Sequence, residues 1–141
     1  MKRRANIGAL SQLRQDGKIA AIGLSNVIVA QLDEALAVAP IAAVQNRLSY
    51  SDPGDLPTAL ACAERGVAHL AYSPFGGPAG LVPQAALAVA GRRGVSAHCV
   101  LLAWLRHQSP NIVPLAGASR PASIRDSAAR LDLTVSDLEA L

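Results

Sequence analysis

Aromatic residues are scarce in this chain, which has one tryptophan, one phenylalanine and two tyrosines among its 141 residues. Ala, Leu, Val and Ile must therefore fill the interior, and at 51% hydrophobic residues there are enough of them for a buried core. A core of small and aliphatic side chains suits a mixture of helices and strands better than an all-β protein. The length fits a single domain, which we expect to span residues 1–141.

Cysteine is also rare. Cys62 and Cys99 lie in apolar, helix-like stretches without the CxxC or CxxH spacing of a metal or redox site. We therefore expect two buried, reduced thiols and no metal. No stretch reaches the ~18 apolar residues of a membrane span, and no signal-peptide pattern opens the chain. These absences predict a cytoplasmic protein that does not enter a membrane.

The excess of charge is small. Lys and Arg number 13 against 10 for Asp and Glu, which gives a net charge of +3. Much of the excess lies in Lys2, Arg3 and Arg4, where no aromatic residues are interleaved. This pattern predicts the solvated start of a helix and no binding to nucleic acid. The positive balance would still favour an anionic cofactor.

Short apolar runs alternate with helix-like segments along the chain. Strands are predicted at residues 19–25, 41–46, 67–73 and 112–115. Helices are predicted at residues 7–17, around 32–36, and at 55–65, 83–92, 96–107, 121–130 and 136–141. Ser96 is the natural N-cap of the helix that follows it, and Pro121 falls in the first turn of its own helix.

This alternation indicates βα units and a parallel sheet whose strands are buried on both faces. The pattern alone leaves two α/β folds open, a doubly wound sheet and a barrel. The first strand is not followed by a G-x-G-x-x-G sequence, which weakens the doubly wound, dinucleotide-binding alternative.

Five segments, in order along the chain, carry a resemblance to one family. They read GKIAAIGLSN (17–26), VQNRLSY (44–50), AYSPFG (71–76), LLAWLRHQSPNIVPLAGASRP (101–121) and SIRDSAARLDLTVSDLEAL (123–141). Together, at this spacing, they resemble the C-terminal half of the bacterial, NADP(H)-dependent aldo-keto reductases. The resemblance covers essentially the whole chain. It implies half of a (β/α)8 barrel, namely strands five to eight of a fold that takes ~250 residues.

The resemblance also implies an activity. The family reduces aldehydes and ketones with NADPH: hydride passes to the carbonyl carbon and a tyrosine protonates the oxygen. The family's catalytic Asp, Tyr, Lys and His lie on the other half of the barrel, so we expect no catalytic residue in this chain. The tyrosines and histidines present do not match the family's catalytic positions; they are Tyr50, Tyr72, His69, His98 and His107.

The resemblance does imply a cofactor site at the strand ends. Ser25, Asn26 and Gln45 would hydrogen-bond the nicotinamide carboxamide, which needs donors and acceptors, at the face where barrels carry their functional loops. Tyr72 would stack on the nicotinamide ring. Strand-end capping and a core tyrosine are the alternatives for any one residue alone. The occurrence of three polar residues at successive strand ends favours binding.

Two loops would hold the cofactor's phosphates. The loop after the third strand would offer backbone N–H groups to the pyrophosphate. The loop after the fourth strand precedes a helix N-terminus, where an arginine and a serine would bind the 2′-phosphate. The residues are Ser73, Phe75 and Gly76 in the first loop and Gly117, Ala118, Ser119 and Arg120 in the second, with Arg125 adding charge nearby. A plain Pro/Gly loop and a solvated arginine are the alternatives.

Two positions depart from the family's pattern. Ser127 stands where the family commonly has an asparagine that contacts adenine, which puts that contact in doubt. Leu48 stands where an aromatic residue is usual, which would thin the wall of the site.

Two functional interpretations remain open. The chain is either a truncated reductase with little activity alone, or a non-catalytic NADP(H)-binding or structural module that pairs with another half-barrel. In both cases the strands near 19–24 and 111–115 would leave open edges with unpaired N–H and C=O groups. The apolar runs Ile19–Leu24 and Val67–Ala71 would face water. We therefore expect a homodimer or a complementary half-barrel as partner.

Overall fold

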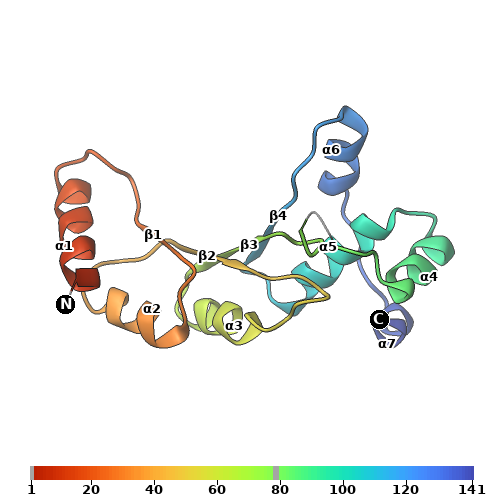
Figure 1. Cartoon of the computed structure of the whole chain (residues 1–141), viewed down its shortest axis with the longest axis horizontal. Helices are drawn as coiled ribbons and strands as arrows, with labels where there is room; N and C mark the ends of the chain where they lie inside the picture. The colour runs from red at the N-terminus through yellow and green to blue at the C-terminus, as the bar shows by residue number, and fades with distance from the viewer. Residues whose placement is uncertain (1, 78–79) are drawn as a thin grey trace.

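The computed structural model describes residues 2–77 and 80–141, which form seven helices and four strands (Figure 1). The helices are α1 Lys2–Gln15, α2 Val29–Leu36, α3 Leu56–Glu64, α4 Gln84–Arg93, α5 Ala97–Gln108, α6 Pro121–Ala128 and α7 Val135–Ala140. The strands are β1 Gly23–Ser25, β2 Ala43–Arg47, β3 Ala68–Tyr72 and β4 Ile112–Leu115. The predicted order of strands and helices is confirmed.

All four strands are parallel and lie side by side in the order of the sequence, β1-β2-β3-β4. Because each connection steps in the same direction, right-handed crossovers bring the helices to one side of the sheet. Helices α2, α3 and α5 indeed lie along one side (Figure 1). A doubly wound sheet would reverse its order and carry helices on both faces. The arrangement is consistent with part of a (β/α)8 barrel.

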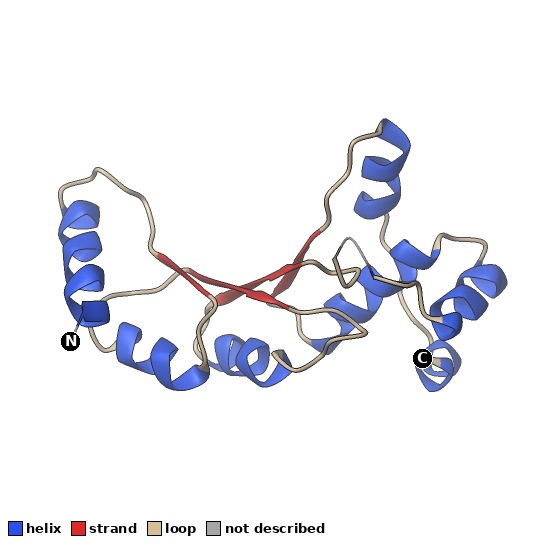
Figure 2. Cartoon of the chain, viewed as in Figure 1, coloured by secondary structure: helices blue, strands red, loops and turns tan. Residues whose placement is uncertain are grey.

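The two faces of the sheet have different surroundings. Toward the helices, Val44, His69, Ala71 and Ile112 are buried. No helix of residues 2–77 and 80–141 covers the opposite face (Figure 2), and its Leu115 is 39% exposed. We call it the open face; its cross-strand rows are Ser25–Gln45–Leu70–Val113 and Arg47–Tyr72–Leu115. The expectation of burial on both faces is therefore wrong, because the helices of the described chain cover one face only.

The apolar runs of the first and third strands follow the same alternation. In the third strand Val67, His69 and Ala71 are buried, whereas the intervening Ala68 and Leu70 are half-buried. In the first run Ile22 is buried, and the half-buried Leu24, on the same face, packs against the helix-side core. Successive side chains of a strand point to opposite faces, so the packed helices remove every second residue from water. The expectation that the whole of both runs faces water is corrected to their open-face residues.

Apolar packing between the helices and the sheet forms the core. Leu32 and Ala35 of α2 pack with Val44 and Cys62. Farther along, Leu105 of α5 packs with residues of β3 and β4, and α4 packs against α5 in a third cluster. Both cysteines are buried free thiols, as predicted. Burial raises the pKa of the Cys62 thiol to about 11, and it also raises the pKa of Cys99.

Two helix starts follow the local rules predicted from the sequence. The Oγ of Ser96 accepts from the N–H of Cys99 at 2.9 Å, which confirms the predicted cap of α5. Pro121 is the first residue of α6, as predicted. The last helix, predicted from residue 136, begins at Val135; Thr134 caps it, and Asp137 completes the capping box.

Some predictions concern residues that the structure does not describe. The side chains of Lys2, Arg3 and Arg4, expected to be solvated, lie outside the described residues, although α1 begins at Lys2 as that pattern suggested. In the Pro/Gly loop, Pro78 and Ala79 also lie outside them. Strand β1 is shorter than the strand predicted at residues 19–25, because it pairs with β2 alone and this pairing begins at Ala43, the first residue of β2.

The outer edge of β4 offers a partner strand carbonyl groups but no free N–H groups. The carbonyl of Asn111 accepts from the N–H of His69 at 2.9 Å. The backbone N–H and C=O groups of residues 111, 113 and 115 therefore point toward β3, and those of residues 112 and 114 point away from the sheet. Ile112 already donates to Ser109, and Pro114 has no N–H. The expectation of unpaired N–H groups along this edge is corrected: β4 presents carbonyls there.

Candidate functional site

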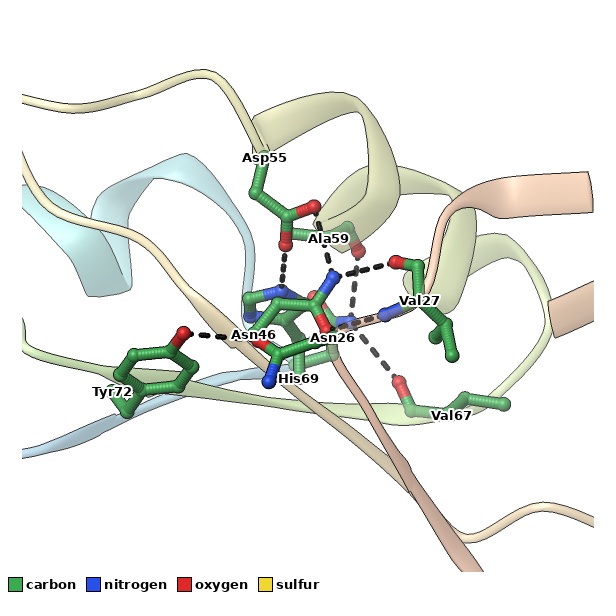
Figure 3. A network of polar contacts seen from close by, with 9 residues as sticks. Asn26, Val27, Asn46, Asp55, Ala59, Val67, His69 and Tyr72 are labelled. Atoms are coloured by element: carbon green, nitrogen blue, oxygen red, sulfur yellow. Dashed lines mark hydrogen bonds and ion pairs between the residues drawn. The ribbon is translucent and has the colours of Figure 1, made fainter. Parts of the chain in front are cut away.

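Polar side chains meet where β1, β2 and β3 end, at one edge of the open face. Ser25 and Gln45 are register partners, and the N–H of Asn26 donates to the carbonyl of Gln45 at 3.1 Å. The hydroxyl of Tyr72 donates to Oδ1 of Asn26 at 2.9 Å (Figure 3). Four residues predicted from the sequence are thus brought together from three strand ends.

Sharp backbone turns shape this cluster. Asn26 and Ser73 both have a φ of +52°, in the left-handed region. For a residue other than glycine this conformation costs roughly 1–2 kcal/mol. Asparagine tolerates it better than most residues do. The turn at Asn26 follows β1 directly and brings the amide within reach of Tyr72, so the surrounding structure must stabilise it.

A buried polar network lies behind the cluster, on the helix side of the sheet (Figure 3). The Oδ1 of Asn46 accepts from the N–H of Val27 at 3.1 Å, and its Nδ2 donates to the carbonyl of Val27 at 2.7 Å. The same Nδ2 donates to Oδ1 of Asp55 at 3.0 Å, and His69 Nε2 lies 2.8 Å from Oδ2. His69 is fully buried. The network therefore links three strands to the residue that precedes α3.

The charge of Asp55 is stabilised by this network. Its partial burial raises its pKa, but hydrogen bonds from His69, Asn46 and Thr58 outweigh that effect, so the pKa lies below its ordinary value. Asp55 is therefore an ionised hydrogen-bond acceptor at neutral pH.

The loop after β3 is fixed by contacts on both sides. The N–H of Gly76 donates to the carbonyl of Ser73 at 2.9 Å, and Arg47 Nη2 donates to the carbonyl of Gly76 at 2.9 Å. Gly80 approaches the backbone of Phe75 so closely that a Cβ at position 80 would collide with the Phe75 carbonyl. Residues 73–77 thus follow Tyr72 along a defined backbone course.

A pocket of about 200 Å³ opens at the start of α6. Its lining residues come from the loop after β3, from α5 and from the region of α6; they are Phe75, His98, Gly117, Arg120, Ser123, Asp126 and Ser127. The rings of Phe75 and His98 meet edge to face, with centroids 4.5 Å apart. Arg120 directly precedes α6, and Ser123, Asp126 and Ser127 of that helix lie in the lining. The Arg120 guanidinium and the serine hydroxyls are suited to a phosphate, whereas the Asp126 carboxylate in the same lining accepts a hydrogen bond from the Ser96 hydroxyl at 2.6 Å.

The structure brings several of the loop residues predicted from the sequence to this pocket. Phe75, Gly117 and Arg120 line it. Ala118 and Ser119 are exposed in the same loop and are not among its lining residues. Arg125 is exposed on α6 and is likewise outside the lining.

Three lining residues were missed in the sequence. Ser123 and Asp126 lie three and six residues after Arg120, a helical spacing that could have identified them. His98 comes from α5, and no local signal in the sequence links that position to α6. Ser127, the departure noted above, does line the pocket.

Leu48 has a different role from the one expected. It is 0% exposed and packs with Ala59 and Leu105 on the helix side. The expectation that it thins a wall of the site is therefore wrong, because the chain after β2 carries this side chain into the core.

A larger pocket, of about 630 Å³, lies beside β4 and away from the strand-end cluster. Residues of α5 and β4 and the segment 130–133 line it, among them Arg106, His107 and Pro114. Among residues 2–77 and 80–141, no group of three or more His, Cys, Asp or Glu side chains is arranged to hold a metal ion. In the same residues no single helix is long and apolar enough to span a membrane; α4 and α5 reach that length and composition only as a pair bent by 103°.

Comparison with protein families gives a match over nearly the whole chain. Residues 3–140 match the model described as the aldo/keto reductase family. Pyridoxine 4-dehydrogenase of Escherichia coli (strain K12) is 35% identical over 133 residues, which are 94% of this chain and 46% of that protein. An uncharacterized oxidoreductase of Schizosaccharomyces pombe is 26% identical over 119 residues, 84% of this chain and 39% of its own length. The chain thus spans less than half the length of these relatives.

Solved structures share the fold. A thermostable aldo-keto reductase in complex with the inhibitor epalrestat aligns with a TM-score of 0.86 and 25% identity, covering 97% of this chain and 53% of its own. A Bombyx mori aldo-keto reductase in complex with NADP aligns with a TM-score of 0.78 and 23% identity, covering 93% of this chain and 46% of its own.

Proposed function

Because this chain belongs to the aldo/keto reductase family, we propose that it is the cofactor-binding half of an NADP(H)-dependent reductase of aldehydes and ketones. Residues 1–141 would form one partial domain, the C-terminal half of the family's barrel. The observation that carries the proposal is the continuity of the site. The cluster at Asn26 and Tyr72, the loop after β3 and the pocket at Arg120 follow one another without a break, since Phe75 belongs to both loop and pocket.

The donor set fits this cofactor. The Tyr72 hydroxyl donates to Oδ1 of Asn26, and Nδ2 of the same side chain can still donate to a carboxamide oxygen. Ser25 and Gln45 are exposed beside it and supply further donors and acceptors. At the other end, Arg120 and the α6 N-terminus suit a 2′-phosphate. The complex of the Bombyx mori relative with NADP supports this choice of cofactor.

When bound, the nicotinamide would supply the hydride. The residues of this chain would hold the carboxamide, support one face of the ring through Tyr72 and neutralise the 2′-phosphate through Arg120. We propose no proton donor among them. The chain alone would therefore bind the hydride donor and leave the carbonyl oxygen without an acid.

The open face would be covered by the other half of the barrel or by a second copy of this chain. Three features support a partner there: the missing helix layer, the exposed Leu115 and Val113, and relatives about twice as long. The alternative function is a non-catalytic NADP(H)-binding module that pairs with another half-barrel. It is favoured by the continuous path of candidate cofactor contacts, together with our assignment of no proton donor to this chain.

Calorimetric titration with NADPH and NADH tests the cofactor proposal. We expect NADPH to bind more tightly by about 10- to 100-fold, since a charge-assisted hydrogen bond contributes roughly 1.5–3 kcal/mol. Arg120→Ala should remove most of this preference. Arg125→Ala is a matched control, because Arg125 is an exposed arginine of the same helix outside the pocket lining. Equal affinities for the two cofactors, or an undiminished preference in Arg120→Ala, would contradict the assignment of the loop.

A further inference from the structure

We propose that Asn46, oriented by Asp55 and His69, is a positioning residue that holds the Ser25-Asn26 turn in shape for the amide end of the bound cofactor. The inference rests on the proposed function for its ligand, but the contacts that carry it are independent of any ligand. Asn46 would not touch the cofactor, because it faces the helix side while its neighbour Gln45 faces the open side.

The side-chain amide of Asn46 forms two hydrogen bonds to the backbone of a single residue, Val27. It accepts from the N–H of Val27 at 3.1 Å and donates to the carbonyl of Val27 at 2.7 Å. Val27 directly follows Asn26, whose φ of +52° is the strained element of the turn. A two-point contact fixes both the position and the direction of the chain after Asn26, which neither bond alone could do. All the atoms involved are buried, so water would not easily replace them.

Asp55 determines which way the Asn46 amide points. Its Oδ1 takes a hydrogen bond from Asn46 Nδ2 at 3.0 Å. A flipped amide would set its oxygen against this carboxylate and would offer a donor to the N–H of Val27, so both ends would be mismatched. The ionised state of Asp55 therefore selects the one orientation that matches Val27 (Figure 3).

His69 in turn fixes the Asp55 carboxylate. Its Nε2 lies 2.8 Å from Oδ2, and its Nδ1 has no hydrogen-bond partner in the part of the chain that the structure describes. A proton on Nε2 gives the carboxylate a donor and leaves Nδ1 as an unfilled acceptor. The other neutral tautomer would bury an unpaired N–H and set two acceptors against each other. His69, on β3, thus orients Asp55, the residue that precedes α3, and through it the Asn46 amide that holds the turn after β1.

The contact between Asn26 and Tyr72 on the open face would depend on this network. The side chain of Asn26 receives the Tyr72 hydroxyl at 2.9 Å, so a shift of the turn would move the amide and its contact with the tyrosine together. The pocket at Arg120 shares no residue with the network. Loss of the network should therefore weaken contacts at the amide end of the ligand and leave those at the phosphate end unchanged.

The test uses two ligands and one measurement that needs no ligand. NADPH spans both ends of the proposed site, whereas 2′,5′-ADP occupies the phosphate end alone. In Asn46→Ala we expect about tenfold weaker NADPH binding and 2′,5′-ADP binding within about twofold of the parent, on the scale of one or two hydrogen bonds. Amide hydrogen exchange at Val27 should accelerate in the same variant. Asp55→Asn keeps the volume and should show a smaller change of the same kind.

Asn111→Ala is the matched control. The side chain of Asn111, like that of Asn46, forms two hydrogen bonds to the backbone: its Nδ2 donates to the carbonyls of Ala59 at 3.0 Å and Val67 at 3.1 Å. It does not contact the turn after β1. It should leave the exchange of Val27 and the ratio of the two affinities unchanged. Unchanged exchange at Val27 in Asn46→Ala would overturn the proposal. So would equal weakening of both ligands, or the same pattern in Asn111→Ala, since each would indicate a general loss of stability. If the parent chain binds neither ligand, the proposed function fails and the positioning role fails with it. The exchange at Val27 would still show whether Asn46 holds the turn after β1.

Discussion

Leu115 offers the sharpest test of whether the open face is an interface. It ends β4 in the same cross-strand row as Tyr72 and is 39% exposed. Leu60, on α3, is 44% exposed but lies on a helix that covers the other side of the sheet. The two leucines are therefore similarly accessible in the isolated chain. They differ only if something covers the open face.

The expected magnitude follows from the exposed fraction. Complete burial of a leucine is worth about 1.5–3 kcal/mol, so covering the remaining 39% of Leu115 contributes about 0.6–1.2 kcal/mol. A two-fold dimer counts this contribution twice, giving roughly 1.2–2.4 kcal/mol. Leu115→Asp loses it and adds the cost of two buried carboxylates. The dissociation constant of a homodimer should therefore rise by at least about 10- to 100-fold.

Light scattering coupled to size exclusion, over a wide range of dilution, measures this effect. We expect the parent chain to be dimeric when concentrated and to dissociate on dilution, with a melting temperature that depends on concentration. Leu115→Asp should be monomeric under the same conditions, and Leu60→Asp should behave as the parent does. A parent chain that is monomeric at every concentration would refute the reasoning, as would equal effects of the two substitutions.

Four further predictions follow from the same structure. Under the proposed function, which assigns no proton donor to this chain, the purified chain should not turn over aldehydes or ketones with NADPH, since general acid catalysis is worth ~10²–10⁴ in rate; rates typical of reductases after stringent purification would contradict this. Gly80→Ala should weaken NADPH binding by displacing the Phe75 carbonyl, whereas Gly91→Ala, where a Cβ meets nothing within 4 Å, should not. The Cys62 thiol, with its pKa raised to about 11, should react with a thiol reagent at pH 8 only after unfolding. Hydrogen bonding from the backbone of Thr134, together with nearby Arg93, lowers the pKa of Asp137. The ionised Asp137 therefore stabilises the fold above about pH 4, and this contribution should disappear as the pH falls through the lowered pKa. The free energies of unfolding of Asp137→Asn and of the parent should accordingly become equal in acid.

Local signals in the sequence were enough for the order of elements. Apolar periodicity, the Ser96 cap and the Pro121 start each depend on a few adjacent residues, and each is confirmed. The surroundings of the strands were not predictable in the same way. A run such as Val67–Ala71 reads the same whether helices cover one face or two, because burial depends on elements far away in the sequence.

The candidate site shows the same division. The residues at strand ends were accessible through the resemblance, since each belongs to a short motif. His98 and the Asn46–Asp55–His69 network were not, because each joins segments that the sequence separates. His69 in particular reads as one more polar residue in an apolar run, and only the approach of Asp55 to within 2.8 Å gives it a partner.

The order of the strands explains why binding and catalysis could separate in such a chain. In a sheet ordered β1-β2-β3-β4, neighbours in sequence are neighbours in space, so the loops that follow consecutive strands form a continuous path. An elongated ligand can lie along that path and contact only one contiguous stretch of chain. A proton donor must instead face the ligand from across the open side, and in a barrel that position belongs to strands remote in sequence. Under the proposed function, such a half would therefore bind the dinucleotide along its own strand ends, while turnover would require a partner that covers the open face.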